Sequence, residues 1–177
     1  YPCEWDYPGY SGPSYMKLTS KNTGLGVVPG VAISGKINYT TFGPRSGFAN
    51  TTRPAALTGA WQYMAFGSDQ GHIAVLLSKW NTTTNSRDTV SFTDYLLPGM
   101  VMSWATFSIP LTYQMGSAPD TAIIVLSASG LVPVNNSYLY VDSLGFSGTV
   151  PLGVVTTATN NTHATIYPNP AGNEATI

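Results

Sequence analysis

The sequence predicts an all-β protein, folded as a single-domain β-sandwich with jelly-roll topology. Seven or eight short stretches are apolar or alternate apolar with polar residues, and no stretch has the period of a helix. Turn-forming residues are frequent, with 18 glycines and 13 prolines. The chain also contains 22 Thr, 17 Ser and 11 Asn, whereas the charged residues that surface helices need are few.

The first half of the chain predicts three strands. Its opening residues alternate aromatic side chains with proline and glycine, which is typical of an extended segment. Gly35 interrupts a later run of period two, and this interruption predicts a β-bulge. The expected elements are an extended segment at residues 1–16, strands at 14–20, 31–42 and 56–67, and a loop at 43–54.

The second half of the chain predicts four more strands. Two of them are apolar on both faces, so we expect them in the centre of a sheet. In another, strict alternation turns Phe107 inward and Trp104 outward, and Pro110 favours a position at the edge of a sheet. The expected elements are central strands at residues 72–80 and 121–129, the alternating strand at 103–113, a last strand at 137–146 and a polar turn at 81–88.

The charge of the chain excludes two classes of partner. With 7 Lys+Arg and 8 Asp+Glu the net charge is −1, and charged residues make up 8% of the chain, against roughly 25% in ordinary soluble domains. No basic run could neutralise a phosphate backbone, which excludes nucleic acid. The longest apolar run, residues 73–77, is far shorter than the ~20 residues that cross a bilayer, so we expect no membrane insertion.

The character of the chain changes after residue 147. Residues 151–165 are rich in Thr and Asn and predict a linker. Residues 166–177 contain the motif YPNP followed by small residues, and they resemble the truncated start of a type IX secretion C-terminal sorting domain. This resemblance implies that residues 1–150 are a folded module of a secreted or cell-surface bacterial protein, whose upstream domains are its partners within the same chain.

The body of the chain also resembles a known family through an ordered series of segments. These are RPAALTGAWQYMAFGSD (53–69), IAVLLSKW (73–80), WATFSIPLTY (104–113), PDTAIIVLSAS (119–129) and SYLYVDSLGF (137–146). The series is similar to the putative carbohydrate metabolism domain. This resemblance implies a jelly-roll sandwich shaped like a carbohydrate-binding module. The basic residue that the family usually has in the first segment is absent, because Gln62 and Met64 stand there.

Aromatic residues beside uncharged polar residues favour sugar binding. Pyranose rings stack their C–H faces on Trp and Tyr, while amide and guanidinium groups donate hydrogen bonds to the hydroxyls. The alternative is that the aromatic residues of the predicted strands belong to the core, as is usual in a β-sandwich. The candidate ligand-binding residues are Trp61, Tyr63, Arg53, Gln62, Trp80 and Trp104.

A carboxylate within the last strand suggests a metal site. The resemblance to carbohydrate-binding modules implies a structural Ca²⁺ held by Asp142 together with Glu4 or Asp6. Calcium takes six to eight oxygen ligands, which these carboxylates and backbone carbonyls could supply. The alternative is that Asp142 accepts hydrogen bonds from backbone amides.

The acidic residues give little support for catalysis. Glycoside hydrolysis needs two facing carboxylates, and the best candidate pair is Asp69 and Asp94. His72 opens an apolar strand, where we expect a structural role rather than that of a base. No catalytic residue is therefore predicted.

Three functions remain as hypotheses. The first is a non-catalytic carbohydrate-binding accessory module, which binds neutral polysaccharide or glycan by aromatic stacking. The second is a structural spacer or adhesin-like module without a ligand, and the third is a glycoside hydrolase that uses an Asp pair. Exposure of the candidate aromatic residues favours the first hypothesis, and their burial favours the second.

Overall fold

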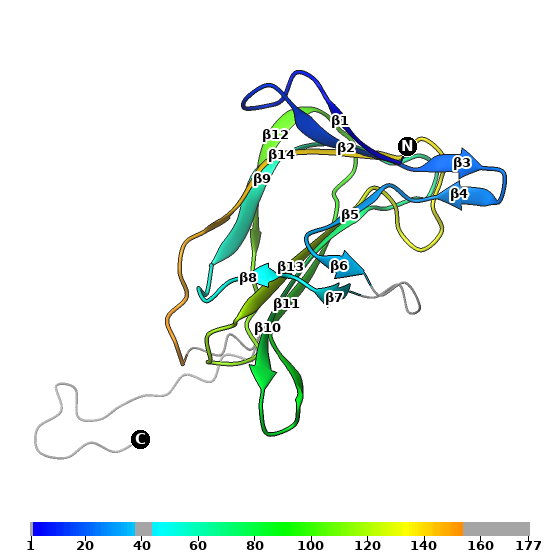
Figure 1. Ribbon diagram of the computed structural model, residues 1–177. Helices are drawn as coiled ribbons and strands as arrows, with labels where there is room; N and C mark the ends of the chain where they lie inside the picture. Colours follow the sequence, from blue (N-terminus) through cyan, green and yellow to red (C-terminus); the bar gives the residue numbers. More distant parts are fainter. Residues whose placement is uncertain (1, 38–43, 154–177) are drawn as a thin grey trace, which may run out of the picture.

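The computed structural model describes residues 2–37 and 44–153, which form strands and no helix (Figure 1). The strands are β1 (Cys3–Asp6), β2 (Tyr15–Thr19), β3 (Lys21–Thr23), β4 (Gly26–Val28), β5 (Val31–Ile33), β6 (Lys36–Ile37), β7 (Pro44–Ser46), β8 (Phe48–Ala49), β9 (Ala56–Met64), β10 (His72–Asn81), β11 (Ser86–Leu96), β12 (Val101–Pro110), β13 (Thr121–Ser127) and β14 (Tyr138–Ser147).

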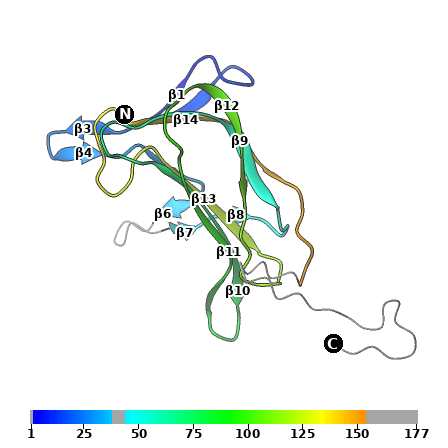
Figure 2. The ribbon, with the colours of Figure 1, turned by 180° about the vertical axis from the view of Figure 1, so that it is seen from behind.

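Two antiparallel sheets form the two layers of a sandwich (Figures 1 and 2). One has the order β1-β2-β14-β9-β12, and the other has the order β11-β10-β13-β5, with β8 also paired to β13. When β2, β5 and β9 to β14 are counted as strands 1 to 8, the sheets have the orders 1-8-3-6 and 2-7-4-5. This is the double Greek key of a jelly roll, so the predicted fold class and topology are confirmed.

The hydrophobic core lies between the two sheets. Strand β10 is buried at Ile73, Val75 and Leu77 and partly exposed at the positions between them, as expected for a strand with one face on the core. Inward-facing residues of β9, β12, β13 and β14 complete the core from the other strands. The side chains that alternate with these residues face outward, and they form the two outer surfaces of the molecule.

Three predictions about strand position are confirmed. Strands β10 and β13 lie inside their sheet, where neighbours on both sides cover their backbones. Strand β12 lies at the edge of the other sheet and ends at Pro110. An edge strand tolerates proline, because only one side of its backbone takes part in the ladder of hydrogen bonds.

Three segments differ from the prediction. The loop predicted at 43–54 contains the short strands β7 and β8. Residues 86–96 form the single strand β11, although the sequence predicted a polar turn as far as residue 88. Its polar first residues pair with the end of β10, up to Asn81 and Ser86. The strand predicted at 31–42 is divided into β5, which pairs with β13, and β6, which pairs with β7, and residues 38–42 lie outside the described residues. A side chain at Gly35 would overlap the carbonyl oxygen of Ser46, so two backbones pass in close contact there.

The predicted boundaries after residue 150 remain predictions. Most of the linker expected at 151–165 and all of the sorting segment expected at 166–177 fall on residues 154–177, which lie outside the described residues. Within the described ranges, no helix is long and apolar enough to cross a membrane.

Candidate functional site

The outer surface of the sheet β11-β10-β13-β5 carries the most continuous set of exposed apolar and polar side chains along one pair of strands. Cross-strand partners share a face, and the residues of β10 that alternate with the buried ones define this surface. We call it the β10–β11 face. It consists of the cross-strand partners Leu96–His72, Asp94–Ala74 and Phe92–Leu76, followed by Trp80 and Arg87. On the β13 side it is bordered by Ser127, Val125 and Ile123, of which Ser127 and Ile123 are buried.

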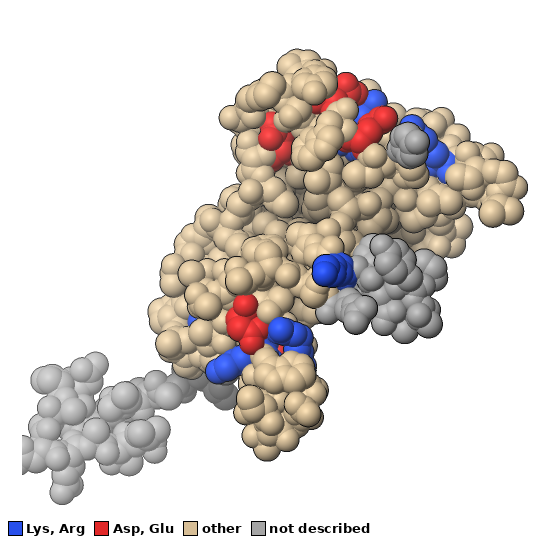
Figure 3. All heavy atoms as spheres, viewed as in Figure 1, with Lys and Arg blue, Asp and Glu red and all other residues tan. Residues whose placement is uncertain are grey.

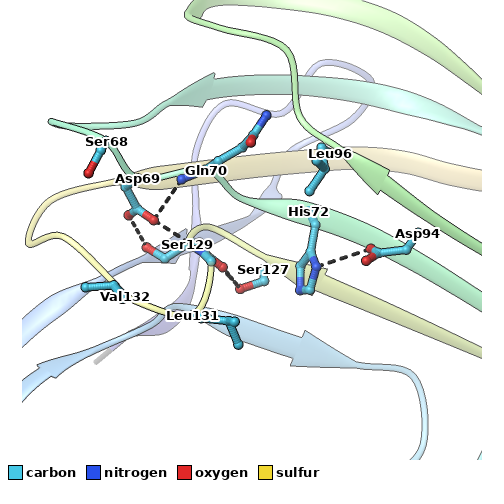
Figure 4. A pocket seen from close by; sticks show the side chains of 11 residues that line it. Ser68, Asp69, Gln70, His72, Asp94, Leu96, Ser127, Ser129, Leu131 and Val132 are labelled. Carbon is cyan, nitrogen blue, oxygen red and sulfur yellow. Dashed lines mark hydrogen bonds and ion pairs between the residues drawn. The ribbon is translucent and has the colours of Figure 1, made fainter.

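A cavity of about 670 Å³ lies at one end of the β10–β11 face (Figure 4). Its walls come from residues 68–70 of the loop before β10, from the ends of β10, β11 and β13, and from residues 129–132 after β13. The cavity therefore combines three neighbouring strand ends with two loops. Polar side chains of Asp69, His72 and Asp94 line it together with apolar ones of Leu96 and Leu131.

Asp69 joins the two loops that wall the cavity. Its carboxylate accepts hydrogen bonds from the Ser129 hydroxyl and from the amides of Gly130 and Val134, the last two at 3.0 Å. Burial alone would raise the pKa of Asp69, but hydrogen bonds from Ser129, Ser137 and these amides outweigh burial and hold the pKa below its ordinary value. Asp69 is therefore an ionised acceptor that fixes the shape of the wall.

His72 and Asp94 form the polar pair of the face. The Nδ1 atom of His72 lies 3.2 Å from Oδ1 of Asp94, on the neighbouring strand (Figure 4). The side chains are 34% and 41% exposed, so both remain accessible to a ligand. Contact through Nδ1 orients the imidazole and leaves Nε2 on the other side of the ring to exchange a hydrogen bond with a bound molecule.

Trp80 is held in place at the other end of the face. Its backbone amide donates a 2.7 Å hydrogen bond to Asp120, which also accepts one of 2.7 Å from Arg87. The Arg87 guanidinium lies 6.0 Å from the centre of the Trp80 ring. Burial would raise the pKa of Asp120, but hydrogen bonds from Thr121, Trp80 and Arg87 outweigh it and lower the pKa to about 2. As a residue, Trp80 is 44% exposed.

The exposed apolar side chains follow one line along β10 and β11. Leu96, Phe92 and Trp80 are 56%, 48% and 44% exposed. From His72 to Trp80 the line is roughly 26 Å long, at ~3.3 Å per strand residue. The polar groups of the face have partners: the His72 imidazole contacts Asp94, and Arg87 is paired with Asp120. In Figure 3, charged groups gather mainly near β1–β2 and at the lower end of β10–β11.

Trp61 and Tyr63 belong to the core, which decides between the two alternatives that the sequence left open. They are only 5% and 1% exposed. Trp61 stacks on Phe107 with ring centres 4.6 Å apart, and the Tyr63 hydroxyl accepts a 2.6 Å hydrogen bond from the Gly71 amide. Their positions in β9 face the other sheet, so neither presents a ring to a sugar, and the expectation of exposed stacking at this pair is corrected.

Arg53 is also buried rather than available to a ligand. Only 3% of the residue is exposed. Its Nη1 donates hydrogen bonds of 2.7 and 2.6 Å to the carbonyls of Met115 and Ser117, and its guanidinium stacks 4.0 Å from the centre of the Tyr113 ring. Arg53 thus joins the loop before β9 to the connection between β12 and β13, and its predicted role in binding is corrected.

The remaining predicted binding residues lie on two different faces. Trp80 belongs to the β10–β11 face, whereas Gln62 and Trp104 lie on the outer surface of the other sheet. Gln62 is the cross-strand neighbour of Tyr140, and the Trp104 ring contacts Tyr15. Trp104 lies on the outward side, as its alternation predicted, but the structure does not bring Trp80 and Trp104 together.

The predicted calcium ligands have other partners. Asp142 accepts hydrogen bonds from the amides of Ser11 and Ser143, at 2.8 and 2.6 Å. Lys17 lies 2.8 Å from Asp6 and 3.5 Å from Glu4, and its hydrogen bond with Asp6 raises the pKa of Lys17 above its ordinary value. Among the described residues, no group of three or more His, Cys, Asp or Glu could hold a metal ion. The Ca²⁺ site stays a prediction.

The sequence named Asp69 and Asp94 as a candidate catalytic pair, and both line the cavity. A glycoside hydrolase needs one carboxylic acid with a raised pKa to protonate the leaving oxygen. The hydrogen bonds of Asp69 lower its pKa instead, and Asp94 is engaged with His72. Ser127 lies beside His72, but its hydroxyl donates a hydrogen bond to the Ser129 carbonyl. The arrangement suits hydrogen bonding to a ligand better than acid catalysis.

Sequence reasoning missed Phe92, Leu96 and the contact of His72 with Asp94. In β11, Phe92, Asp94 and Leu96 face outward. A predicted turn that ended at residue 85 would have left a strand in which this alternation is visible. The pairing of Asp94 with His72 could not be found, because it depends on which strands are neighbours.

Comparison with known proteins leaves the family open. No family model matches the chain, and no curated protein matches it. Membership in the putative carbohydrate metabolism domain family therefore stays a prediction.

Several solved structures are similar to the chain. One is described as a Family 16 Carbohydrate Binding Module-2, with 13% identity, a TM-score of 0.48, and coverage of 84% of this chain and 86% of that chain. Another is the K3 cleaved adhesin domain of Lys-gingipain from Porphyromonas gingivalis W83, with 11% identity, a TM-score of 0.44, and coverage of 81% and 79%. A third is a non-crystalline cellulose specific carbohydrate-binding module, CBM28, with 9% identity, a TM-score of 0.46, and coverage of 82% and 80%. Because the identities and TM-scores are this low, these structural similarities carry no argument about function.

Proposed function

We propose that this protein is a non-catalytic carbohydrate-binding module, which binds a neutral polysaccharide or glycan along the β10–β11 face. One observation carries the proposal: Trp80, Phe92 and Leu96 are exposed in one line, with accessible polar groups between and beside them. We further propose that the module serves as an accessory part of a secreted or cell-surface bacterial protein, as the type IX resemblance implies.

The chemistry of the face matches that of a sugar chain. A pyranose ring has an apolar C–H face, which stacks on an aromatic ring, and a rim of hydroxyls, which need hydrogen-bond partners. Trp80 and Phe92 offer the rings, while His72, Asp94 and Arg87 offer donors and acceptors. Because the groups that fix Trp80 are bonded to one another, the platform is organised before a ligand arrives, which reduces the entropy that binding costs.

The paired charges favour an uncharged ligand. The Arg87 guanidinium is paired with the Asp120 carboxylate, and the His72 imidazole contacts the Asp94 carboxylate. An anionic polysaccharide would have to displace one of these carboxylates, and a cationic one would have to displace His72 or Arg87. A neutral glycan can bind beside both pairs without breaking either of them.

A spacer without a ligand is the second hypothesis. It predicts outer surfaces of short polar side chains, such as Thr106 and Ser108 on β12. The line of Leu96, Phe92 and Trp80 departs from that pattern, because these large apolar side chains are exposed on one outer surface. This departure supports binding over the spacer hypothesis.

Affinity electrophoresis tests the proposal. The intact chain is run in native gels that contain barley β-glucan, xyloglucan, glucomannan, galactomannan, arabinoxylan or soluble starch. We expect retention on at least one of these, and a loss of at least tenfold in affinity for Trp80→Ala and for Phe92→Ala. Phe48→Ala is the matched control, since Phe48 is 41% exposed but lies off the β10–β11 face, against Phe146.

Two results would contradict the proposal. One is wild-type protein that migrates past all six polysaccharides without retention. The other is retention that Trp80→Ala and Phe92→Ala leave unchanged, or that Phe48→Ala weakens equally. Circular dichroism of each variant separates loss of binding from loss of folding.

A further inference from the structure

Five aromatic rings form a chain of contacts on the outer surface of the sheet β1-β2-β14-β9-β12. We call them the aromatic row. Tyr10 lies 6.0 Å from Trp104, and Trp104 lies 5.3 Å from Tyr15 in an edge contact, between ring centres. Tyr15 lies 5.1 Å from Tyr140, and Tyr140 stacks on Tyr138 at 4.4 Å. Tyr10 is 48% exposed and the other four are partly exposed.

The strand register explains why these rings share a face. Tyr140 pairs with Lys17 on one side and Gln62 on the other, whereas its neighbours Leu139 and Val141 point into the core. Tyr10 joins the row from the loop after β1, which both views place beside β12 (Figures 1 and 2). The row therefore extends across the sheet from β12 to β2 and lies opposite to the β10–β11 face.

The row is held rigidly. Asp142, beside Tyr15 in the register, accepts the 2.8 Å hydrogen bond from the Ser11 amide that ties the Tyr10 loop to the sheet. A Cβ at Gly9 would lie 2.9 Å from the Asp142 carboxylate, so the loop packs closely there. Ala60 has no exposed surface although its register places it on this outer face, so larger groups cover it. Rings fixed in this way lose little entropy on binding.

The carboxylates beside the row have partners: Asp6 and Glu4 lie near Lys17, and Asp142 accepts hydrogen bonds from backbone amides. Lys17, which lies 5.9 Å from the centre of the Tyr140 ring, is bonded to Asp6 and lies near Glu4. Burial raises the pKa of Tyr15 and of Tyr140, so their hydroxyls remain neutral donors and acceptors. The uncharged amide of Gln62 adds a further polar group. The surface thus combines apolar rings with neutral polar tips.

We propose that the aromatic row is a second binding site for neutral glycan, so that one molecule binds two polysaccharide chains, one on each outer surface. The inference rests on the proposed function, since it assigns the same class of ligand to a second site. Tyr10 and Trp104 provide the stacking surface, and the tyrosine hydroxyls and Gln62 exchange hydrogen bonds with the sugar. Because the sites lie on opposite sheets, occupation of one leaves the other open, and the protein crosslinks polysaccharide.

Paired variants test the two sites separately in the six polysaccharide gels named above. Tyr10→Ala/Trp104→Ala removes the stacking surface of the aromatic row, and Trp80→Ala/Phe92→Ala removes that of the β10–β11 face. We expect each double variant to keep part of the retention, with affinity reduced at least tenfold, and the quadruple variant to migrate as in gels without polysaccharide. We expect wild-type protein, but neither double variant, to precipitate the polysaccharide it binds.

The outcomes distinguish the two proposals. If Tyr10→Ala/Trp104→Ala protein is retained as strongly as wild-type protein, the proposed site on the aromatic row is overturned and the site on the β10–β11 face stands. Full loss in that variant, with no effect of Trp80→Ala/Phe92→Ala, supports the aromatic row and contradicts the β10–β11 face. Concentration-dependent dimerisation that Tyr10→Ala abolishes, without any change in retention, assigns the row to protein contact and overturns the inference.

Hydroxyl-radical footprinting avoids the risk that Trp104→Ala fails to fold. Trp80→Ala/Phe92→Ala protein, with its aromatic row intact, is labelled with and without the retaining polysaccharide, and oxidation is located by mass spectrometry. We expect at least threefold protection of Tyr10 and Trp104, with no change at Trp5, which is 68% exposed and absent from the contacts of the row. Equal oxidation of Tyr10 and Trp104 with and without polysaccharide overturns the inference.

Discussion

Arg53 shows how a single cation can organise a chain that has few charges. It is buried, stacks on Tyr113 and supplies hydrogen bonds to the carbonyls of Met115 and Ser117. Burial raises the pKa of Tyr113 to about 12, and the Tyr113 hydroxyl donates a 2.7 Å hydrogen bond to the Pro54 carbonyl. This cluster closes the end of the sandwich opposite to the cavity walls, where backbone carbonyls would otherwise lack donors.

Removing the Arg53 guanidinium tests this role. We expect Arg53→Met to lower the free energy of unfolding by about 3 kcal/mol, because two buried carbonyls lose charged donors and the ring loses its cation. Urea unfolding followed by fluorescence measures the change. Lys79→Met is the control, since Lys79 is exposed, and we expect a change within about 0.5 kcal/mol. A loss below about 1 kcal/mol in Arg53→Met would refute the structural role.

Asp69 gives the protein a defined acid sensitivity. Its pKa in the folded state is lowered, so the folded state holds fewer protons than the unfolded chain. The stabilisation is complete above the unfolded pKa of about 3.9, and it is lost as the pH falls through the folded pKa. We expect wild-type protein to lose more stability between pH 5 and pH 3 than Asp69→Asn, measured by urea unfolding at each pH. Parallel pH profiles would argue against this assignment.

Among the elements, the connection between β4 and β5 is packed tightly across β2. A Cβ at Gly30 would lie 2.4 Å from the Thr19 amide nitrogen and 2.8 Å from the Leu18 carbonyl carbon. Since these are backbone atoms, neither can rotate away. We expect Gly30→Ala to destabilise the protein by about 2 kcal/mol or more, measured by thermal and urea unfolding.

Gly99 provides the control for that substitution. A Cβ there meets nothing within 4 Å, so Gly99→Ala is expected to leave stability unchanged or to raise it slightly. Equal stability of Gly30→Ala and wild-type protein would show that the β4–β5 connection can shift away from β2.

The strands also show what sequence patterns can and cannot predict. The pattern of β12 has one clearly apolar side, so it correctly predicted that Trp104 faces outward. In β9 both sides carry large apolar residues, Trp61 and Tyr63 on one and Met64 on the other, so the pattern could not decide which side faces the core. Strand patterns alone could not predict the site, because the His72–Asp94 contact depends on β10 and β11 being neighbours.

At the scale of the whole molecule, low charge and jelly-roll topology work together. The topology places one outer surface on each sheet, and the scarcity of charged residues leaves both surfaces nearly neutral. Each surface carries aromatic side chains in a row and pairs the cations near them with carboxylates. The proposed ligand, a neutral glycan, is compatible with this combination, since its binding requires no ion pair to break.

The most direct test of that claim follows the β10–β11 face during binding. A ¹H–¹⁵N NMR titration is made with a neutral oligosaccharide cut from the polysaccharide that retains the protein best. We predict saturable shifts of the Trp80 indole signal and of the Phe92 and His72 amides, while the Trp61 indole, buried in the core, stays unchanged. Saturable shifts elsewhere that leave Trp80 and Phe92 unmoved would contradict the account.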